Sequence, residues 1–103
     1  MNIDEKIEKY LNEESINYKK WDVDALIDFV DNSTELEKYV NKNHSYDDGV
    51  FNGNGIKNTI FAKALKISPN EIKKFVKTIN DNTRDYGGYV DFDNGYIQIS
   101  PEA

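Results

Sequence analysis

Six lysines between positions 57 and 80 are the clearest candidates for ligand binding in this sequence. Glu71 is the only acidic residue in that stretch, although the whole chain of 103 residues has a formal net charge of −6. Each lysine carries a positive charge with three N–H donors, so a cluster of them binds anions such as phosphate. A positive segment in an acidic chain indicates that one face meets an anion while the remaining surface repels it. The lysines are Lys57, Lys63, Lys66, Lys73, Lys74 and Lys77.

Catalytic chemistry has few candidates in this sequence. Cysteine is absent and His44 is the only histidine, which leaves no partners for a nucleophilic triad or a thiolate metal site. The stretches at residues 47–55 and 91–95 resemble calcium loops but lack the ligand spacing that such loops require, and turn chemistry explains both. We therefore expect no enzymatic activity, no cofactor, no metal and no small-molecule substrate.

The composition is that of one small folded protein. Seven tyrosines, five phenylalanines and one tryptophan argue against disorder, and 103 residues suffice for a single modest core. Because cysteine is absent, nothing requires an oxidising compartment, and no stretch approaches the length of a membrane span. We expect a cytoplasmic protein without a membrane partner, in which residues 1–103 form a single domain.

The first third of the chain has the pattern of acidic amphipathic helices. Two apolar stripes repeat at helical spacing: Ile3, Ile7, Tyr10 and Leu11, and then Val23, Leu26, Ile27 and Val30. Residues 1–49 hold six lysines and 13 acidic residues. We interpret residues 1–33 as acidic helices that form the contact surface of a homodimer. A capping box at Asn32 and Glu35 predicts a third helix to about Asn43, with Leu36, Tyr39 and Val40 turned inward.

A loop and a further helix follow. Residues 43–55 are rich in Gly, Asn and Asp, which predicts a loop that holds a short strand at Val50 and Phe51. Periodic apolar residues then predict a helix from Ile56 to near Lys66. Its inward residues are Ile56, Ile60, Phe61, Ala64 and Leu65.

The next helix has the strongest start signal in the chain. Ser68 is positioned to cap the free amides, Pro69 occupies the first helical position and Glu71 completes a capping box. Its apolar residues follow the helical period without exception: Ile72, Phe75, Val76 and Ile79.

The chain ends in a predicted β-hairpin over residues 89–100. The pair Asn94 and Gly95 predicts a type I′ turn, in which both central residues need a positive φ. This turn pairs Phe92 with Ile97 and Val90 with Ile99, so that one register places these apolar residues on the inner face.

This order of elements is similar to that of the winged helix-turn-helix superfamily. The stretch IFAKALKISPNEIKKFVKTI resembles its pattern in the small Ala62, in Leu65 before the turn and in the Ile-Ser pair that leads into the second helix. The resemblance covers roughly residues 34–100. Lys66 departs from it, because the superfamily often has glycine there and a left-handed lysine costs about 1 kcal/mol. We therefore expect this turn to differ locally from the usual one. The resemblance implies an α+β fold: a mostly helical core with a C-terminal two-stranded β-wing and an N-terminal helical extension.

The resemblance also implies double-stranded DNA as the usual partner. The second helix (residues 69–80) would enter the major groove, and the wing (residues 89–100) would touch the backbone or minor groove. The polar face of the second helix suits phosphates and base edges, although any solvated helix carries lysines and that alternative stays open. The helical candidates for DNA binding are Lys63, Asn70, Lys73, Lys74 and Lys77, and Asn80 is expected on the same face.

Residues around the wing complete the candidate set. Arg84 is the only arginine and suits a guanine edge or a narrow minor groove, so we expect specificity to depend on it, although a solubilising charge is the alternative. The tyrosines could reach phosphates, shield the sheet or form a dimer contact. Because Asp91 and Asp93 would repel phosphates, DNA contact would fall to the tip of the wing and its uncharged side chains. These wing candidates are Tyr86, Tyr89, Asn94, Tyr96 and Gln98.

Together these patterns predict a sequence-specific DNA-binding protein. Its expected role is that of a regulator or accessory factor of a plasmid or phage, in transcription regulation at an operator or in conjugation at a transfer origin. The alternative is a protein–protein interaction module, such as a phage or plasmid inhibitor that acts through the acidic N-terminal face.

Overall fold

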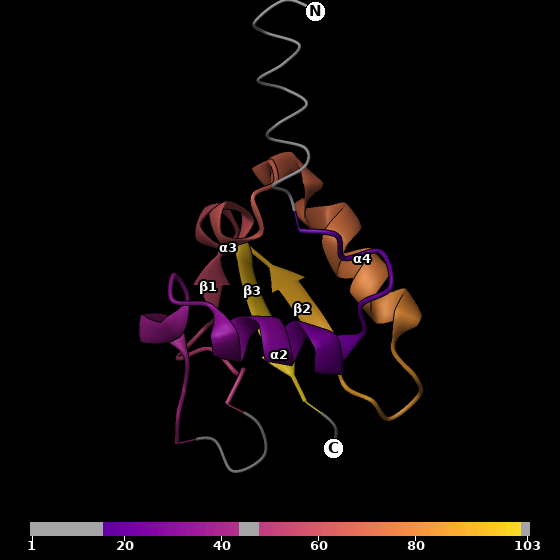
Figure 1. Cartoon of the computed structure of the whole chain (residues 1–103), viewed down its shortest axis with the longest axis horizontal. Coiled ribbons are helices and arrows are strands. Elements are labelled where there is room, and N and C mark those ends of the chain that lie inside the picture. The colour runs from indigo at the N-terminus through magenta and orange to yellow at the C-terminus, as the bar shows by residue number, and fades with distance from the viewer. Residues whose placement is uncertain (1–15, 44–47, 102–103) are drawn as a thin grey trace, which may run out of the picture.

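The computed structural model describes residues 16–43 and 48–101 of the chain. Within these residues, three α-helices precede a C-terminal β-hairpin, and the hairpin belongs to a three-stranded antiparallel sheet (Figure 1). This confirms the predicted α+β class. The helices are α2 (Val23–Asn32), α3 (Asn58–Leu65) and α4 (Ile72–Asn82), with 3₁₀ turns η1 (Glu37–Tyr39) and η2 (Pro69–Glu71). The strands are β1 (Ile56–Lys57), β2 (Tyr89–Asp93) and β3 (Tyr96–Ser100).

The core lies between the inner face of the sheet and the three helices. The predicted apolar stripes of α2 and α4 are confirmed, because Val23, Leu26 and Val30 are buried on α2 and Ile72, Phe75 and Ile79 on α4. Phe61 of α3 joins the two sides of this core, since its ring centroid lies 5.7 Å from that of Phe51 and 5.4 Å from that of Phe75. Each buried phenylalanine stabilises the fold by about 1.5–3 kcal/mol.

The hairpin has the predicted register. Phe92 pairs with Ile97 and Val90 with Ile99, and the turn residues Asn94 and Gly95 have φ values of 53° and 81°. Positive φ at both positions is the requirement of the type I′ turn that the sequence predicted.

The turn between α3 and α4 is left-handed at Lys66, so the local difference expected from a lysine at this position is not seen. Lys66 has φ 61° and ψ 38°, and its N–H bonds back to the last turn of α3. Ser68 accepts a hydrogen bond from the Asn70 N–H at 3.2 Å, as predicted for the start of the next helix. The capping box is only half present, because the Glu71 carboxylate accepts a hydrogen bond from Tyr18 instead.

The predicted third helix over residues 32–43 is wrong. Asn32 is the last residue of α2, and its amide donates to the Asp28 carbonyl at 2.8 Å rather than starting a new helix. Only the short turn η1 forms, and Val40 is extended and pairs with Phe51 in an isolated antiparallel bridge. β-Branched Val40 suits an extended partner better than a helix, and this bridge confirms the short extended segment expected near Phe51.

The helix expected from Ile56 begins two residues later, because Ile56 and Lys57 form a third strand beside β3. Gly55 makes this close approach achievable. Its φ is +106°, and a Cβ at that position would lie 2.1 Å from the Ile97 carbonyl oxygen. Only glycine fits there without displacing the strand.

The strand order β1-β3-β2, with α2 before β1 and α3 and α4 between β1 and β2, is consistent with a winged-helix-like topology. No helix of the described part is long and apolar enough to cross a membrane. The predicted first apolar stripe (residues 3–11) and His44 lie outside the described residues, as does much of the surface (residues 1–33) that we predicted for a homodimer.

Candidate nucleic-acid interface

One side of α4 and of the turn η2 before it faces solvent along its whole length. The apolar stripe of α4 faces the core, so the opposite side presents long polar side chains, as the sequence predicted. We call this surface the lysine face of α4. Its exposed residues are Asn70, Lys73, Lys74 and Lys77, with the exposed Asp81 one turn after Lys77.

The lysines of this face differ in their partners. Lys77 makes an ion pair with Asp81 at 2.7 Å, and this hydrogen bond raises the pKa of Lys77 above its ordinary value, so the lysine stays charged. Lys73 and Lys74 make no ion pair with any described residue. Lys63 is exposed in the last turn of α3, where a positive charge complements the helix dipole.

Asn80 does not belong to the lysine face, which corrects the sequence-based expectation. Its side-chain oxygen accepts from the Val90 N–H at 2.7 Å, and its amide donates to the Val90 carbonyl at 3.0 Å. The amide thus replaces a neighbouring strand at the free edge of β2 and ties α4 to the sheet. Because both the donor and the acceptor of this amide bond to the backbone of β2, the Asn80 side chain has a structural role.

Gln98 has a similar role at the other edge of the sheet. Its side-chain oxygen accepts from the Phe51 N–H at 2.9 Å, and its amide donates to the carbonyls of Phe51 at 2.9 Å and Gly53 at 3.2 Å. Its oxygen also accepts from the Ile99 N–H at 3.0 Å, so the predicted contact between Gln98 and DNA competes with four hydrogen bonds inside the protein.

The wing is short, and β1 and the start of α3 hold it in place. Lys57 pairs with Tyr96, the first residue after the hairpin turn, so the three strands end level with one another. The Asn58 N–H also donates to the Gly95 carbonyl at 2.8 Å, which anchors the tip beside α3. Asn94 remains exposed at this tip.

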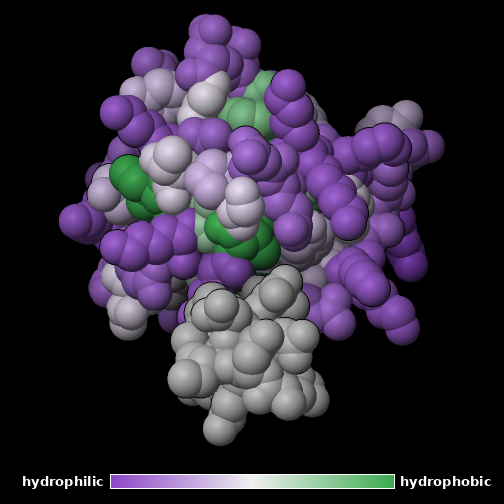
Figure 2. All heavy atoms as spheres, turned by 90° about the horizontal axis from the view of Figure 1, so that it is seen from above, coloured by the Kyte–Doolittle hydropathy of each residue, from purple (hydrophilic) through white to green (hydrophobic). Residues whose placement is uncertain are grey.

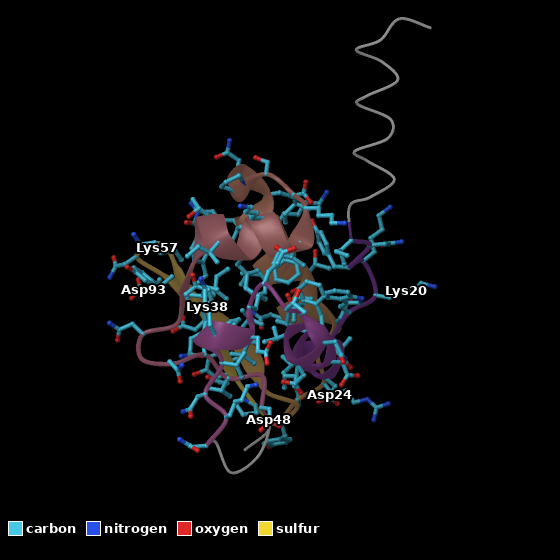
Figure 3. All side chains as sticks on the ribbon, turned by 60° about the vertical axis from the view of Figure 1, so that its left-hand side comes forward. Lys20, Asp24, Lys38, Asp48, Lys57 and Asp93 are labelled. Carbon is cyan, nitrogen blue, oxygen red and sulfur yellow. The ribbon has the colours of Figure 1, made fainter. Side chains whose placement is uncertain are left out.

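The outer face of the sheet carries mixed charges. Tyr89 and Tyr96 are exposed, and Lys57, Tyr96 and Asp93 form one row across the three strands. Figure 3 shows Lys57 and Asp93 at the same side of the molecule. We call this surface the outer sheet face, and its residues are Lys57, Tyr89, Asp91, Asp93, Tyr96, Gln98 and Ser100.

Arg84 and Tyr86 lie beyond the C-terminal end of α4, at the opposite end from Asn70. They line a polar hollow with three carboxylates, those of Asp22, Asp24 and Asp85. Tyr86 is 87% exposed and has a φ of 69°, in the left-handed region. The structure thus surrounds Arg84 with negative charge instead of bringing it to the lysine face of α4.

The sequence-based reasoning missed Lys19, which the fold places beside α4. The side-chain amide of Asn82 donates to the Lys19 carbonyl at 2.9 Å, across more than sixty positions of sequence. No local pattern could have found this neighbour, because neither a helical nor a strand period links residues so far apart.

No known protein-family model matches the chain, and neither a curated protein nor a solved structure matches it. The arrangement of charges is therefore the main guide to function. Among the described residues, no group of three or more His, Cys, Asp or Glu side chains could hold a metal ion. Seen from above, the molecule is covered mostly by hydrophilic residues with small separate apolar patches, which suits a polar or charged partner (Figure 2).

Proposed function

We propose that this protein binds double-stranded DNA through the lysine face of α4. The observation that carries the proposal is that α4 turns its apolar stripe to the core, whereas its three lysines, and Asn70 of η2 before it, are exposed on the other side. The winged-helix-like order of the elements supports it, because such folds often present their second helix to DNA. Membership of the superfamily is part of this proposal.

The proposed docking places α4 in the major groove. An α-helix fits a groove about 12 Å wide, so lysines along its outer side meet phosphates and Asn70 at its start meets base edges. Asparagine pairs bidentately with adenine, which makes Asn70 the best candidate for sequence reading in this helix. Lys63 on α3 would add a phosphate contact.

The wing takes a peripheral position in this proposal. Asp91 and Asp93 repel phosphates on the outer sheet face, and Gln98 is engaged within the protein. Contacts from the wing would therefore come from Asn94 at the tip and from the hydroxyls of Tyr89 and Tyr96. The surroundings of Arg84 favour α4 over Arg84 as the source of specificity. A role in regulation or transfer of a mobile element stays a prediction.

Fluorescence anisotropy with labelled duplexes tests this function. The chain is titrated at several salt concentrations against DNA selected from a random pool and against scrambled duplexes. The variant Lys73→Gln with Lys77→Gln should lose two phosphate contacts, so the slope of log K against log salt should fall by about 1.8.

The matched control is Lys38→Gln with Lys42→Gln, which changes the net charge equally on two exposed lysines outside α4. It should bind like the parent protein. Absence of binding at low salt would contradict the proposal, and so would equal losses in the two variants.

An acidic surface supports one alternative function. α2 contains no basic residue and exposes Asp24 and Asp28, with Glu35 and Glu37 following. A basic protein partner could dock on this surface. Asp24→Lys with Asp28→Lys would abolish such docking and leave DNA binding intact, whereas the Lys73 and Lys77 substitutions would have the reverse effect.

A further inference from the structure

The segment before α2 runs alongside α4, on the side away from β2 (Figure 1). The Tyr18 hydroxyl donates to the Glu71 carboxylate at 2.5 Å, at the start of α4. At the other end of the helix, the Asn82 amide donates to the carbonyls of Lys19 and Trp21, each at 2.9 Å. These bonds hold the segment to α4 at both ends of the helix.

Packing makes the position of this segment well defined. Tyr18 is 7% exposed, and its ring meets that of Phe75 edge to face at a centroid distance of 4.9 Å. Burial, together with the hydrogen bond to Glu71, raises the pKa of Tyr18, so its hydroxyl stays a neutral donor. Rings packed in this geometry add about 0.5–1.5 kcal/mol beyond the burial of their area.

As a result, two lysines from distant parts of the chain line one hollow. Lys19 and Lys74 lie around it together with Asn17, Glu71 and Thr78. Both lysines are exposed, and neither makes an ion pair with a described residue. Among the described residues, Glu71 is the one acidic residue that lines this hollow, and its carboxylate accepts the hydrogen bond from Tyr18. Two lysines against one carboxylate give the described lining residues a net positive charge.

We propose that Lys19 and Lys74 form a phosphate clamp that extends the lysine face of α4 onto the segment before α2. This inference rests on the proposed DNA binding. A helix in the major groove has a phosphate strand along each side, and the clamp lies on the side opposite β2. Because phosphate contacts position a protein without reading sequence, the clamp strengthens binding to every duplex alike.

Lys20 provides a matched control for Lys19. It is the next residue and is also exposed, but it does not line the hollow, and Figure 3 shows its side chain pointing away from the body of the molecule. The substitutions Lys19→Gln and Lys20→Gln change the net charge equally and leave the backbone hydrogen bond from Asn82 in place. They differ only in whether the lost charge belongs to the hollow.

The experiment measures the salt dependence of DNA binding for the full chain and its single variants. Lys19→Gln and Lys74→Gln should each reduce the slope of log K against log salt by about 0.9 and weaken binding roughly five-fold at 0.15 M salt. The loss should be the same for selected and scrambled duplexes, and Lys20→Gln should match the parent. Circular dichroism and Trp21 fluorescence check that the variants are folded.

Two results would overturn these inferences separately. If the parent binds DNA but Lys19→Gln matches Lys20→Gln in slope and affinity, the clamp is wrong and DNA binding by α4 stands. If the parent binds no duplex even at low salt, DNA binding itself is wrong and the clamp falls with it.

Discussion

The lysine face of α4 and the outer sheet face are both exposed, yet they offer a ligand very different chemistry. On α4, Lys73 and Lys74 extend into solvent without an ion pair to any described residue. On the sheet, Asp91 and Asp93 are negative, and the Gln98 amide is used within the protein. A polar side chain is therefore available to a ligand only when the fold leaves its donors and acceptors unused.

Two amides show how the fold makes that choice. Asn80 bonds to both backbone groups of Val90, and Gln98 bonds to both backbone groups of Phe51. Each amide pairs with both the N–H and the carbonyl of one residue where an adjacent strand is missing. The periodicity that placed Asn80 with the lysines is correct for an isolated helix, but α4 packs against β2 on that side.

The largest expected effect comes from reversing the charge on each face. Lys73→Glu with Lys77→Glu should weaken DNA binding by at least roughly thirty-fold at 0.15 M salt, because two phosphate contacts are lost. Asp91→Lys with Asp93→Lys should strengthen it slightly, because the wing is peripheral in the proposed docking. Anisotropy titration measures both. A large gain in the second variant would place DNA on the outer sheet face instead.

Asn70 in η2 and Asn80 in the last turn of α4 should respond differently to substitution. Asn80→Ala should lower the free energy of unfolding by about 1–2 kcal/mol, because it leaves both backbone groups of Val90 without their partner. Asn70→Ala removes an exposed side chain and should change stability by less than about 0.5 kcal/mol while weakening DNA binding. Urea unfolding and anisotropy separate the two. If Asn80→Ala instead weakened DNA binding without lowering stability, Asn80 would belong to the DNA interface.

Alkaline pH tests how the segment before α2 is anchored. The folded state raises the pKa of Tyr18, whereas the unfolded chain ionises at the ordinary value of 10.0. The stabilisation is therefore complete below pH 10 and is lost as the pH rises above it. Tyr18→Phe should cost about 0.5–1.5 kcal/mol near neutral pH and flatten this alkaline loss. The exposed Tyr89→Phe is the control, and equal curves for both variants would exclude Tyr18 as the cause.

The smallest effect concerns the turn that orients α4. Lys66→Gly should stabilise the protein by up to about 1 kcal/mol, because glycine adopts φ 61° without strain. The same substitution at Lys63, inside α3, should destabilise it by about 1 kcal/mol. Thermal unfolding of the two variants should thus shift in opposite directions. A shift to lower temperature for both would show that Lys66 is not strained.

Much of the fold was readable from the sequence because it depends on neighbours a few residues apart. The apolar stripes of α2 and α4 follow from helical periodicity, and Asn94 with Gly95 sets the hairpin register through turn geometry. The lysine face follows from the same period. The sharp turn between α3 and α4 was foreseeable from their short connection, but its left-handed Lys66 was not, because glycine is the residue that adopts this conformation without strain.

Only the tertiary structure decided which polar groups remain available. β1 is two residues long and exists because Gly55 allows it to lie against β3, a contact that no local pattern encodes. Asn80 and Gln98 lose their availability to strand edges, and Lys19 gains a neighbour in Lys74 through the bonds of Asn82. Hydrogen bonding between distant segments depends on where the whole chain places them. The sequence by itself therefore determined where charge lies along each element, and packing determined which charges act together.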